Sequence, residues 1–254
     1  MFPILFHLGP ITLHTYGLLV AFGFLAAFSY ATAEFDRLGL PVRMLDHLVL
    51  YLMLSGIVGA RIFYFVFEGW DEFLAHPLSF FRIWEGGLVY FGGVVVGLLA
   101  LAIYARFHEL PFILLSDAFS APLLLGHAIG RLGCFAAGCC FGKPTTSFFH
   151  VVYSNPDSLA PLNVPLYPTQ IYESLGTLAL FLGAWGLGKR SPKLGVITSY
   201  YLLGYGLLRF FLEFLRGDDR GTFVHGFSPA QIIALIMMGA GVVLATYVRR
   251  QKTV

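Results

Sequence analysis

Long apolar runs separated by short polar connections are the dominant pattern of this chain. Runs of this kind predict membrane-spanning helices, because a helix needs about 20 predominantly apolar residues to cross the hydrocarbon core. The pattern predicts such helices at residues 11–33, 47–67, 87–107, 111–130, 168–188, 194–215 and 227–248. We therefore expect an all-α polytopic membrane protein with about seven transmembrane helices, forming a single transmembrane domain over residues 1–254.

Two intervening segments do not fit the pattern of a span. Residues 68–85 are too polar to cross a membrane and contain Trp70 and Trp84, which is typical of an amphipathic segment lying on the membrane surface. Residues 134–167 show no clear periodicity and contain several prolines. Long irregular segments within compact proteins are commonly functional, so we expect this one to be an arm over a site.

The composition supports the membrane assignment. The 254 residues are 57% hydrophobic and only 12% charged, with a mean hydropathy of +0.77, whereas soluble domains carry about 25% charged residues. The sequence shows no basic patch of the kind that binds nucleic acid, so we expect no nucleic-acid partner. The first ten residues lack the cationic region of a cleavable signal peptide, so we expect the first span to be retained.

The distribution of Lys and Arg predicts the orientation. Basic residues are more frequent in the connections that would share a side with the C-terminus, among them Arg37, Arg43, Lys189 and Arg190. Because cytoplasmic connections carry the excess of positive charge, the chain is expected to be N-out and C-in. Tyr16, the cysteine-containing arm and the end of the sixth span would then gather at the outer face.

Arginines inside or at the ends of apolar runs are the first candidates for function, because a charge in lipid is costly. Arg61, Arg131 and Arg209 have this property. His127 precedes Arg131 by four residues and lies on the same helical face. The alternative interpretations are that Arg131 is an interfacial anchor and that His127 only makes a hydrogen bond within the bundle.

A polar stripe marks the sixth span, where Tyr205, Arg209 and Glu213 are each four residues apart. Arg209 and Glu213 could form a simple buried ion pair, which would leave Tyr205 unexplained. Guanidinium groups bind phosphate through a bidentate fork and keep their charge when partly buried. Arg131 and Arg209 therefore indicate a site for the phosphate of a lipid head group, with Glu213 orienting Arg209.

The start of the fifth span adds Gln170 and Glu173, which lie on one helical face. Glu173 could bind substrate, or it could simply be favoured in the first turn by the helix dipole. The three cysteines, Cys134, Cys139 and Cys140, are too close in sequence for a scaffold of distant disulfides. Zinc sites usually have four ligands at recurrent spacings, so we expect structural thiols, no metal site and no cofactor.

The stretch Gly130–Gly142, GRLGCFAAGCCFG, resembles the signature of the prolipoprotein diacylglyceryl transferase family. The likeness covers nearly the whole chain in order, and its further parts are Tyr16–Gly17, Trp84–Gly87 with Gly92–Gly93, Tyr167–Glu173 and Tyr205–Arg216. The resemblance implies a seven-span, N-out enzyme of the bacterial cytoplasmic (inner) membrane, with its active site toward the extracytoplasmic face. Such an enzyme transfers the diacylglyceryl group of phosphatidylglycerol to the lipobox cysteine thiol in the signal peptide of a prolipoprotein. This first step of lipoprotein maturation releases glycerol phosphate.

The resemblance, carried over residue by residue, and the helical spacings together give two groups of candidate residues. The expected catalytic residues are Arg131, Arg209, Glu213 and Tyr16. The two arginines are also expected to bind the phosphate and head group, and the further substrate-site residues are Tyr205, Gly92, Gly93, Cys134, Gly142, His127, Gln170 and Glu173. Within this group Gly142 is the structural glycine that closes the signature.

The chain departs from the family pattern at three positions. Phe91 occupies the position before the second glycine pair, where members often carry a histidine proposed as a base. Cys134 and Cys139 occupy positions that are often Asn and acidic. A thiol has a pKa near 8.5 and reacts as the thiolate. We therefore expect Arg131 and Arg209 to lower the pKa of the substrate thiol, with His127 as the alternative base.

Two other classes of function stay open at this point. A family member without catalysis could bind lipid or lipoprotein precursors as an accessory factor, and Phe91 is the feature that favours this alternative. A lipid or solute transporter could use the same arginines as a binding or gating site. Transporters often show two related hydropathy halves, and no such repeat is visible in this sequence.

Overall fold

The computed structural model describes residues 2–8, 11–190, 193–218 and 226–250. The chain divides into two compact units, one formed by Met1–Ala31 with Ser116–Val254 and the other by Thr32–Leu115. We call them the first and the second unit.

Helices dominate the described residues. Five of the helices are long and apolar enough to cross a membrane: α1 (Thr15–Arg37), α2 (Val42–Phe67), α4 (Tyr90–Phe107), α5 (Phe112–Ala137) and α8 (Pro229–Arg250). The predicted fifth and sixth spans correspond to α6 (Thr169–Gly188) and α7 (Val196–Glu213), which are not among these five. A mostly helical membrane protein is thus confirmed, whereas seven crossings and the N-out orientation stay predictions.

The first unit begins with a hairpin of β1 (Ile4–Leu8) and β2 (Ile11–His14). The sequence predicted a helix from residue 11, but residues 11–14 alternate between apolar and polar, which suits a strand. The helix α1 begins only at Thr15, whose backbone N–H donates to the Pro3 carbonyl at 3.0 Å.

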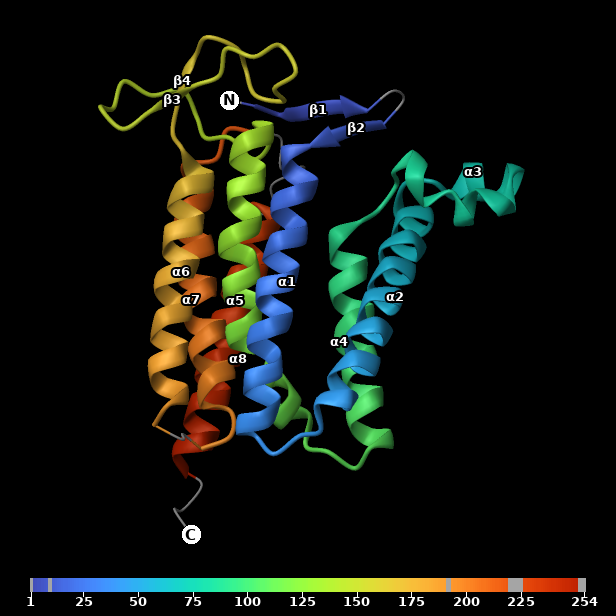
Figure 1. Cartoon of the computed structure of the whole chain (residues 1–254), viewed down its shortest axis with the longest axis vertical. Helices are drawn as coiled ribbons and strands as arrows, with labels where there is room; N and C mark the ends of the chain where they lie inside the picture. The colour runs from blue at the N-terminus through green and yellow to red at the C-terminus, as the bar shows by residue number, and fades with distance from the viewer. Residues whose placement is uncertain (1, 9–10, 191–192, 219–225, 251–254) are drawn as a thin grey trace. The chain divides into compact units, whose positions relative to one another are not determined.

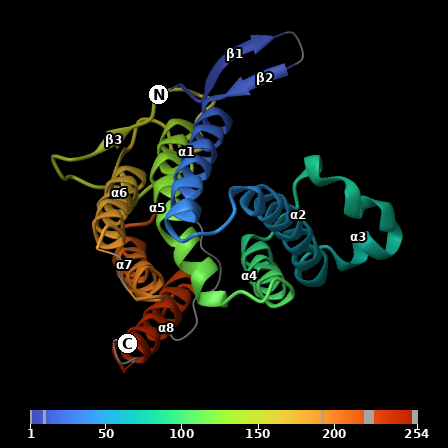
Figure 2. The same ribbon diagram turned by 60° about the horizontal axis from the view of Figure 1, so that its bottom comes forward.

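Small residues bring α1 and α5 together, and Figures 1 and 2 show the two helices side by side. A Cβ atom added to Gly23 would lie 2.8 Å from the Gly126 carbonyl oxygen. A Cβ atom added to Gly133 would lie 3.2 Å from the Tyr16 carbonyl oxygen. Glycine at these positions permits close backbone approach, and the packing places Tyr16 next to the signature stretch.

The helix α5 continues past the predicted end at residue 130 and ends at Ala137. Gly138 follows with a φ of +79°, a left-handed conformation that commonly ends helices. Cys134 therefore lies on the helix and not in the arm. The arm begins after the helix and contains the short antiparallel pair β3 (Val151–Val152) and β4 (Pro165–Leu166).

Tyr153 is the centre of a small core within the arm, where it packs with Ala160 and Leu166. Burial raises the pKa of Tyr153 to about 12, so its hydroxyl stays protonated at neutral pH. This hydroxyl donates to the Phe135 carbonyl at 3.3 Å and accepts from Gln170 Nε2 at 3.3 Å. The arm is thereby attached to α5 and α6.

At the other end of the first unit, Asp117 of α5 caps the N-terminus of α7. Its carboxylate accepts hydrogen bonds from the Gly195 N–H at 2.6 Å, and from the N–H and hydroxyl of Thr198 at 2.8 and 2.6 Å. The first N–H groups of a helix lack partners within the helix, and a negative charge near them is favourable. Asp117 thus fixes the start of α7 against α5.

The helix α8 begins with a reciprocal cap. Ser228 Oγ accepts from the Gln231 N–H at 3.2 Å, and Gln231 Oε1 accepts from the Ser228 N–H at 3.0 Å. This capping box, followed by Pro229 at the first helical position, determines where the helix starts. The predicted start at residue 227 is therefore two residues early.

In the second unit, α2 packs along α4, and Figure 2 shows them side by side. A Cβ atom added to Gly92 would lie 2.5 Å from the Gly59 carbonyl oxygen, and one added to Gly93 would lie 3.1 Å from the Gly56 carbonyl oxygen. The second glycine pair therefore permits close contact between these two helices.

The segment between α2 and α4 consists of α3 (Trp70–Ala75) and the 3-10 turns η1 (Pro77–Phe81) and η2 (Ile83–Glu85). Arg61 of α2 is buried and donates to the carbonyl oxygens of Phe80 at 3.1 Å and Gly86 at 2.6 Å, and also to that of Ser79. Its guanidinium lies 4.6 Å from the centre of the Phe65 ring. Arg61 thus holds this segment against α2 by satisfying its carbonyl groups.

Candidate active site

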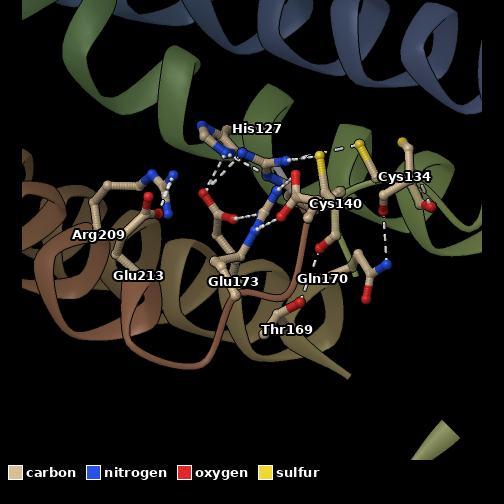
Figure 3. Close-up of polar contacts among 12 residues, drawn as sticks. His127, Cys134, Cys140, Thr169, Gln170, Glu173, Arg209 and Glu213 are labelled. Carbon is tan, nitrogen blue, oxygen red and sulfur yellow. Dashed lines mark hydrogen bonds and ion pairs between the residues drawn. The ribbon is translucent and has the colours of Figure 1, made fainter. Parts of the chain in front are cut away.

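The carboxylate of Glu173, near the start of α6, is the centre of a buried polar cluster in the first unit (Figure 3). Its Oε1 accepts hydrogen bonds from Arg131 Nη2 at 3.0 Å and from the Tyr205 hydroxyl at 3.3 Å. His127 Nε2 lies 3.2 Å from the same oxygen, and Arg216 Nη1 lies 3.8 Å from Oε2. Glu173 therefore connects α5, α6 and the C-terminal end of α7.

His127 and Arg131 lie on one face of α5, as their spacing predicts. Arg131 Nε donates to His127 Nε2 at 3.0 Å, and a neutral imidazole with its proton on Nδ1 accepts this bond. A protonated ring would instead donate from Nε2 to Glu173. The imidazole also lies 5.1 Å from the Tyr205 ring, centre to centre.

All three nitrogen atoms of the Arg131 guanidinium have partners. Besides His127 and Glu173, Nη1 donates to Cys140 Sγ at 3.3 Å and to Cys134 Sγ at 3.8 Å. Only 17% of its side chain is exposed. A buried guanidinium requires such partners, and here they fix its orientation, which argues against a simple interfacial anchor.

Arg209 and Glu213 form the ion pair that the sequence predicted, with 2.7 Å between Nη2 and Oε2. Glu213 Oε1 also accepts from Ser228 Oγ at 2.7 Å. Arg209 interacts electrostatically with Glu173, and Figure 3 shows the pair beside the Glu173 cluster. Among the described residues, nothing forms a hydrogen bond with the buried Nη1 of Arg209.

Arg216 is a member of the cluster that the sequence analysis did not single out. It is buried, and its Nε and Nη2 donate to the two oxygens of Asp218, each at 2.8 Å. Arg209, Glu213 and Arg216 are spaced four and three residues apart, so the same helical periodicity would have identified it. The cluster thus has three arginines.

Tyr16, at the start of α1, is 45% exposed and interacts electrostatically with Arg131 and the cysteine thiols. It lies at the edge of the cluster, next to Gly133. This position is compatible with contact to a substrate that approaches from the membrane.

Gln170 and Gly142 hold the loop that follows α5. Gln170 Nε2 donates to the Cys139 carbonyl at 2.7 Å, and the neighbouring Thr169 hydroxyl donates to the Cys140 carbonyl at 2.9 Å. A Cβ atom on Gly142 would lie 2.4 Å from the Tyr167 carbonyl oxygen, so a larger residue would displace this segment. Both residues position the signature loop against α6.

The three cysteine thiols come together at this loop. Cys134 is buried, Cys139 and Cys140 are half-buried, and the three Sγ atoms all lie within 4.8 Å of one another. Such a group could hold a metal ion, a possibility that the sequence spacing did not predict.

The structure thus brings together most of the candidate residues. His127, Arg131, Glu173 and Tyr205 are in direct contact around one carboxylate, and the other members of the first unit surround them. Gly92 and Gly93 belong to the second unit, at the contact between α2 and α4.

The fold, with arginines, carboxylates and a histidine clustered at one end of the helices, is that of a helical integral membrane protein with a polar functional site. The model of the prolipoprotein diacylglyceryl transferase family matches residues 3–247. Because the match covers nearly the whole length, the chain belongs to this family.

Curated relatives agree with this assignment. The chain is 35% identical to the phosphatidylglycerol–prolipoprotein diacylglyceryl transferase of Pseudoalteromonas atlantica, over 98% of this chain and 90% of the relative. It is 33% identical to transferase 2 of Clostridium perfringens, over 91% and 90%. The transferase of Synechocystis is also 33% identical, over 95% and 88%. The family assignment does not favour the accessory-factor or transporter alternatives.

Proposed function

We propose that the chain transfers the diacylglyceryl group of phosphatidylglycerol to the lipobox cysteine thiol of prolipoproteins, and that the reaction occurs at the Arg131–Glu173–Arg209 cluster. The names of the relatives support both substrates. The observation that carries the site is the buried Nη1 of Arg209, which has no hydrogen-bond partner within the described ranges of the chain. A buried donor without a partner is costly, and a phosphate oxygen of the lipid would satisfy it.

The reaction forms a carbon–sulfur bond. The thiolate of the acceptor attacks the glyceryl carbon that carries the phosphate, the carbon–oxygen bond breaks, and glycerol phosphate leaves with the bonding electrons. Negative charge therefore grows on the leaving phosphate. Guanidinium groups held in fixed positions stabilise such charge without reorganising.

The two arginines have different roles in this proposal. Arg209 offers Nη1 to the phosphate while Nη2 stays with Glu213. Arg131 is held by Glu173 and His127 and contributes mainly fixed positive charge. Tyr205 donates to the same carboxylate and limits its movement. Glu173 and Glu213 are thus positioning residues for the arginines.

The acceptor thiol must lose its proton, either to a base or to solvent, before it attacks. His127 Nε2 accepts from Arg131, and the neutral ring then carries its proton on Nδ1. Neither ring nitrogen is therefore free to act as a base while this bond is made. The arginines favour the thiolate directly, because positive charge lowers the pKa of a nearby thiol. This positive environment therefore favours the thiolate form of the acceptor.

The site is proposed to face the extracytoplasmic side of the bacterial cytoplasmic membrane. Within the first unit, the arm and the N-terminal hairpin lie at one end of the helices, and α8 ends at the other (Figure 1). Arg249 and Arg250 close α8, and basic residues favour the cytoplasmic side. These features support an outward-facing site and an N-out orientation.

The test uses the full chain in phosphatidylglycerol vesicles with a lipobox peptide and labelled lipid. A thioether-linked product is expected from the unmodified protein and none from Arg209→Gln. Arg106→Gln, which changes an exposed arginine at the end of α4, should keep the activity. Peptide that binds without modification would indicate an accessory factor, and lipid movement without product a transporter.

A further inference from the structure

The cysteine cluster of Cys134, Cys139 and Cys140 has no role in the transfer as described so far. Its three Sγ atoms lie within 4.8 Å of one another, and all three residues are free cysteines. The cluster adjoins the proposed active site, because Arg131 Nη1 donates to two of its sulfur atoms.

The backbone holds these thiols together by a specific turn. Cys140 has a φ of +61°, a left-handed conformation uncommon for residues other than glycine. The Cys139 carbonyl is bound by Gln170 and the Cys140 carbonyl by Thr169, and both of these partners are fully buried. The turn directs Cys139 and Cys140 back toward Cys134 on the last turn of α5.

The charges around the cluster suit bound thiolates. Arg131 donates to Cys140 Sγ at 3.3 Å, and Arg216 interacts electrostatically with the same thiol. A divalent cation with three thiolate ligands carries net negative charge, which these arginines would balance. Their N–H groups also hydrogen-bond to sulfur and would orient the ligands.

The donor set indicates the metal. Three thiolates without a carboxylate or imidazole in the group favour a thiophilic ion such as Zn²⁺. With Zn–S bonds of about 2.3 Å, tetrahedral geometry separates ligand sulfur atoms by about 3.8 Å. This separation is compatible with the three Sγ atoms, which all lie within 4.8 Å of one another. Three protein ligands leave a fourth position open, as in catalytic zinc sites.

We propose that Cys134, Cys139 and Cys140 bind Zn²⁺ and that the open position takes the acceptor thiol, a role that rests on the proposed transfer reaction. Coordination deprotonates a thiol, and the proton passes to solvent. The bound thiolate then attacks the glyceryl carbon, the carbon–oxygen bond to the phosphate breaks, and glycerol phosphate leaves. The thioether product carries no charge on sulfur and leaves the metal.

Metal analysis of the purified full chain tests the site without reference to activity. About one zinc ion per chain is expected, with loss of the metal in Cys139→Ala. Cys139→Asp is the matched control, because a carboxylate is also a zinc ligand, and it should retain part of the zinc. No zinc in the unmodified protein, or unchanged zinc in Cys139→Ala, would overturn the site. So would an intramolecular disulfide found in place of the metal.

Cobalt tests the open position. The Co²⁺-substituted protein should show sulfur-to-cobalt charge-transfer absorption that shifts when the lipobox peptide is added, and should not shift with a peptide carrying serine for cysteine. An unchanged spectrum with the cysteine peptide would overturn thiol binding. Chelation of the unmodified protein should remove transfer, and added zinc should restore it, which avoids reliance on a variant that fails to fold.

The two proposals fail in different ways. Full transfer by zinc-free protein would overturn metal activation and leave the transferase function intact. If the protein contains zinc and the cobalt spectrum shifts with the peptide, but no thioether product forms, the transfer reaction and the catalytic role of the metal are overturned. The metal site itself would stand.

Discussion

Arg131 and Glu173 form an ion pair of 3.0 Å between α5 and α6, in which the carboxylate side chain is only 1% exposed. The same carboxylate oxygen also accepts from Tyr205 of α7. One buried acidic group therefore orients side chains from two other helices, and one of these side chains is Arg131, the arginine of the signature stretch.

Glu173→Gln should destabilise the protein and abolish transfer. Removing one partner of a buried pair leaves an uncompensated charge, which costs about 3–5 kcal/mol. Thermal unfolding in detergent measures the loss of stability, and the peptide assay measures transfer. Glu68→Gln changes an exposed carboxylate and should behave like the unmodified protein. A Glu173→Gln protein with an unchanged unfolding temperature would contradict a central role for this carboxylate.

Arg209→Lys should bind phosphatidylglycerol more weakly, because an ammonium group cannot pair with Glu213 and a phosphate through a rigid fork. We expect an increase in KM of about tenfold, which corresponds to about 1.4 kcal/mol. The measurement is the dependence of the transfer rate on lipid content in mixed micelles. An unchanged KM would argue that Arg209 has only a structural role.

His127→Gln should retain most of the activity, because the glutamine oxygen can accept the hydrogen bond from Arg131 Nε. A general base contributes about 10²–10⁴-fold. A loss of that size, together with loss of the pH dependence on the acidic limb, where a base becomes protonated, would identify His127 as the base instead. The pH profile of kcat/KM distinguishes the two outcomes.

Asp117→Ala should destabilise the protein and leave KM for the lipid unchanged. The substitution removes the cap of α7 and leaves buried N–H groups of Gly195 and Thr198 without this acceptor. Loss of a cap costs about 0.5–2 kcal/mol. Thermal unfolding reports the change, and Asp71→Asn on the exposed start of α3 is the control. A selective effect on KM would indicate an unexpected contact with substrate.

Gly92→Ala should destabilise the second unit, since its methyl group would meet the Gly59 carbonyl oxygen at 2.5 Å. Overpacking of this kind costs about 1–3 kcal/mol. Gly97→Ala on the same helix meets nothing within 4 Å and is the matched control. If Gly92→Ala leaves stability unchanged but weakens lipid binding, the substrate-site role implied by the family resemblance would be supported instead.

The sequence predicted the helices well, because a long apolar run in a membrane must satisfy its backbone hydrogen bonds internally, and the helix is the structure that does so within one segment. It was less accurate at their ends, where local interactions decide. Residues 11–14 form a strand because apolar and polar residues alternate there. The helix α5 continues to Ala137 because Gly138 is the first residue after it that adopts the left-handed conformation.

The candidate site was predicted only where a simple helical spacing exists. His127 with Arg131 and Arg209 with Glu213 are four residues apart, and both pairs form. The central position of Glu173 depends on the packing of three helices, which no local pattern encodes. The cysteine cluster depends on the backbone turn at Cys140, and the sequence spacing alone indicated only structural thiols.

The hydroxyl of Ser228 has two tasks, because it accepts from the N–H of Gln231 and donates to the carboxylate of Glu213. An aspartate would start α8 equally well but would set two negative charges against each other beside Arg209. An alanine would serve neither purpose. One hydroxyl group therefore links the start of the last helix to the charge balance beside Arg209, although the two lie on separate segments of the chain.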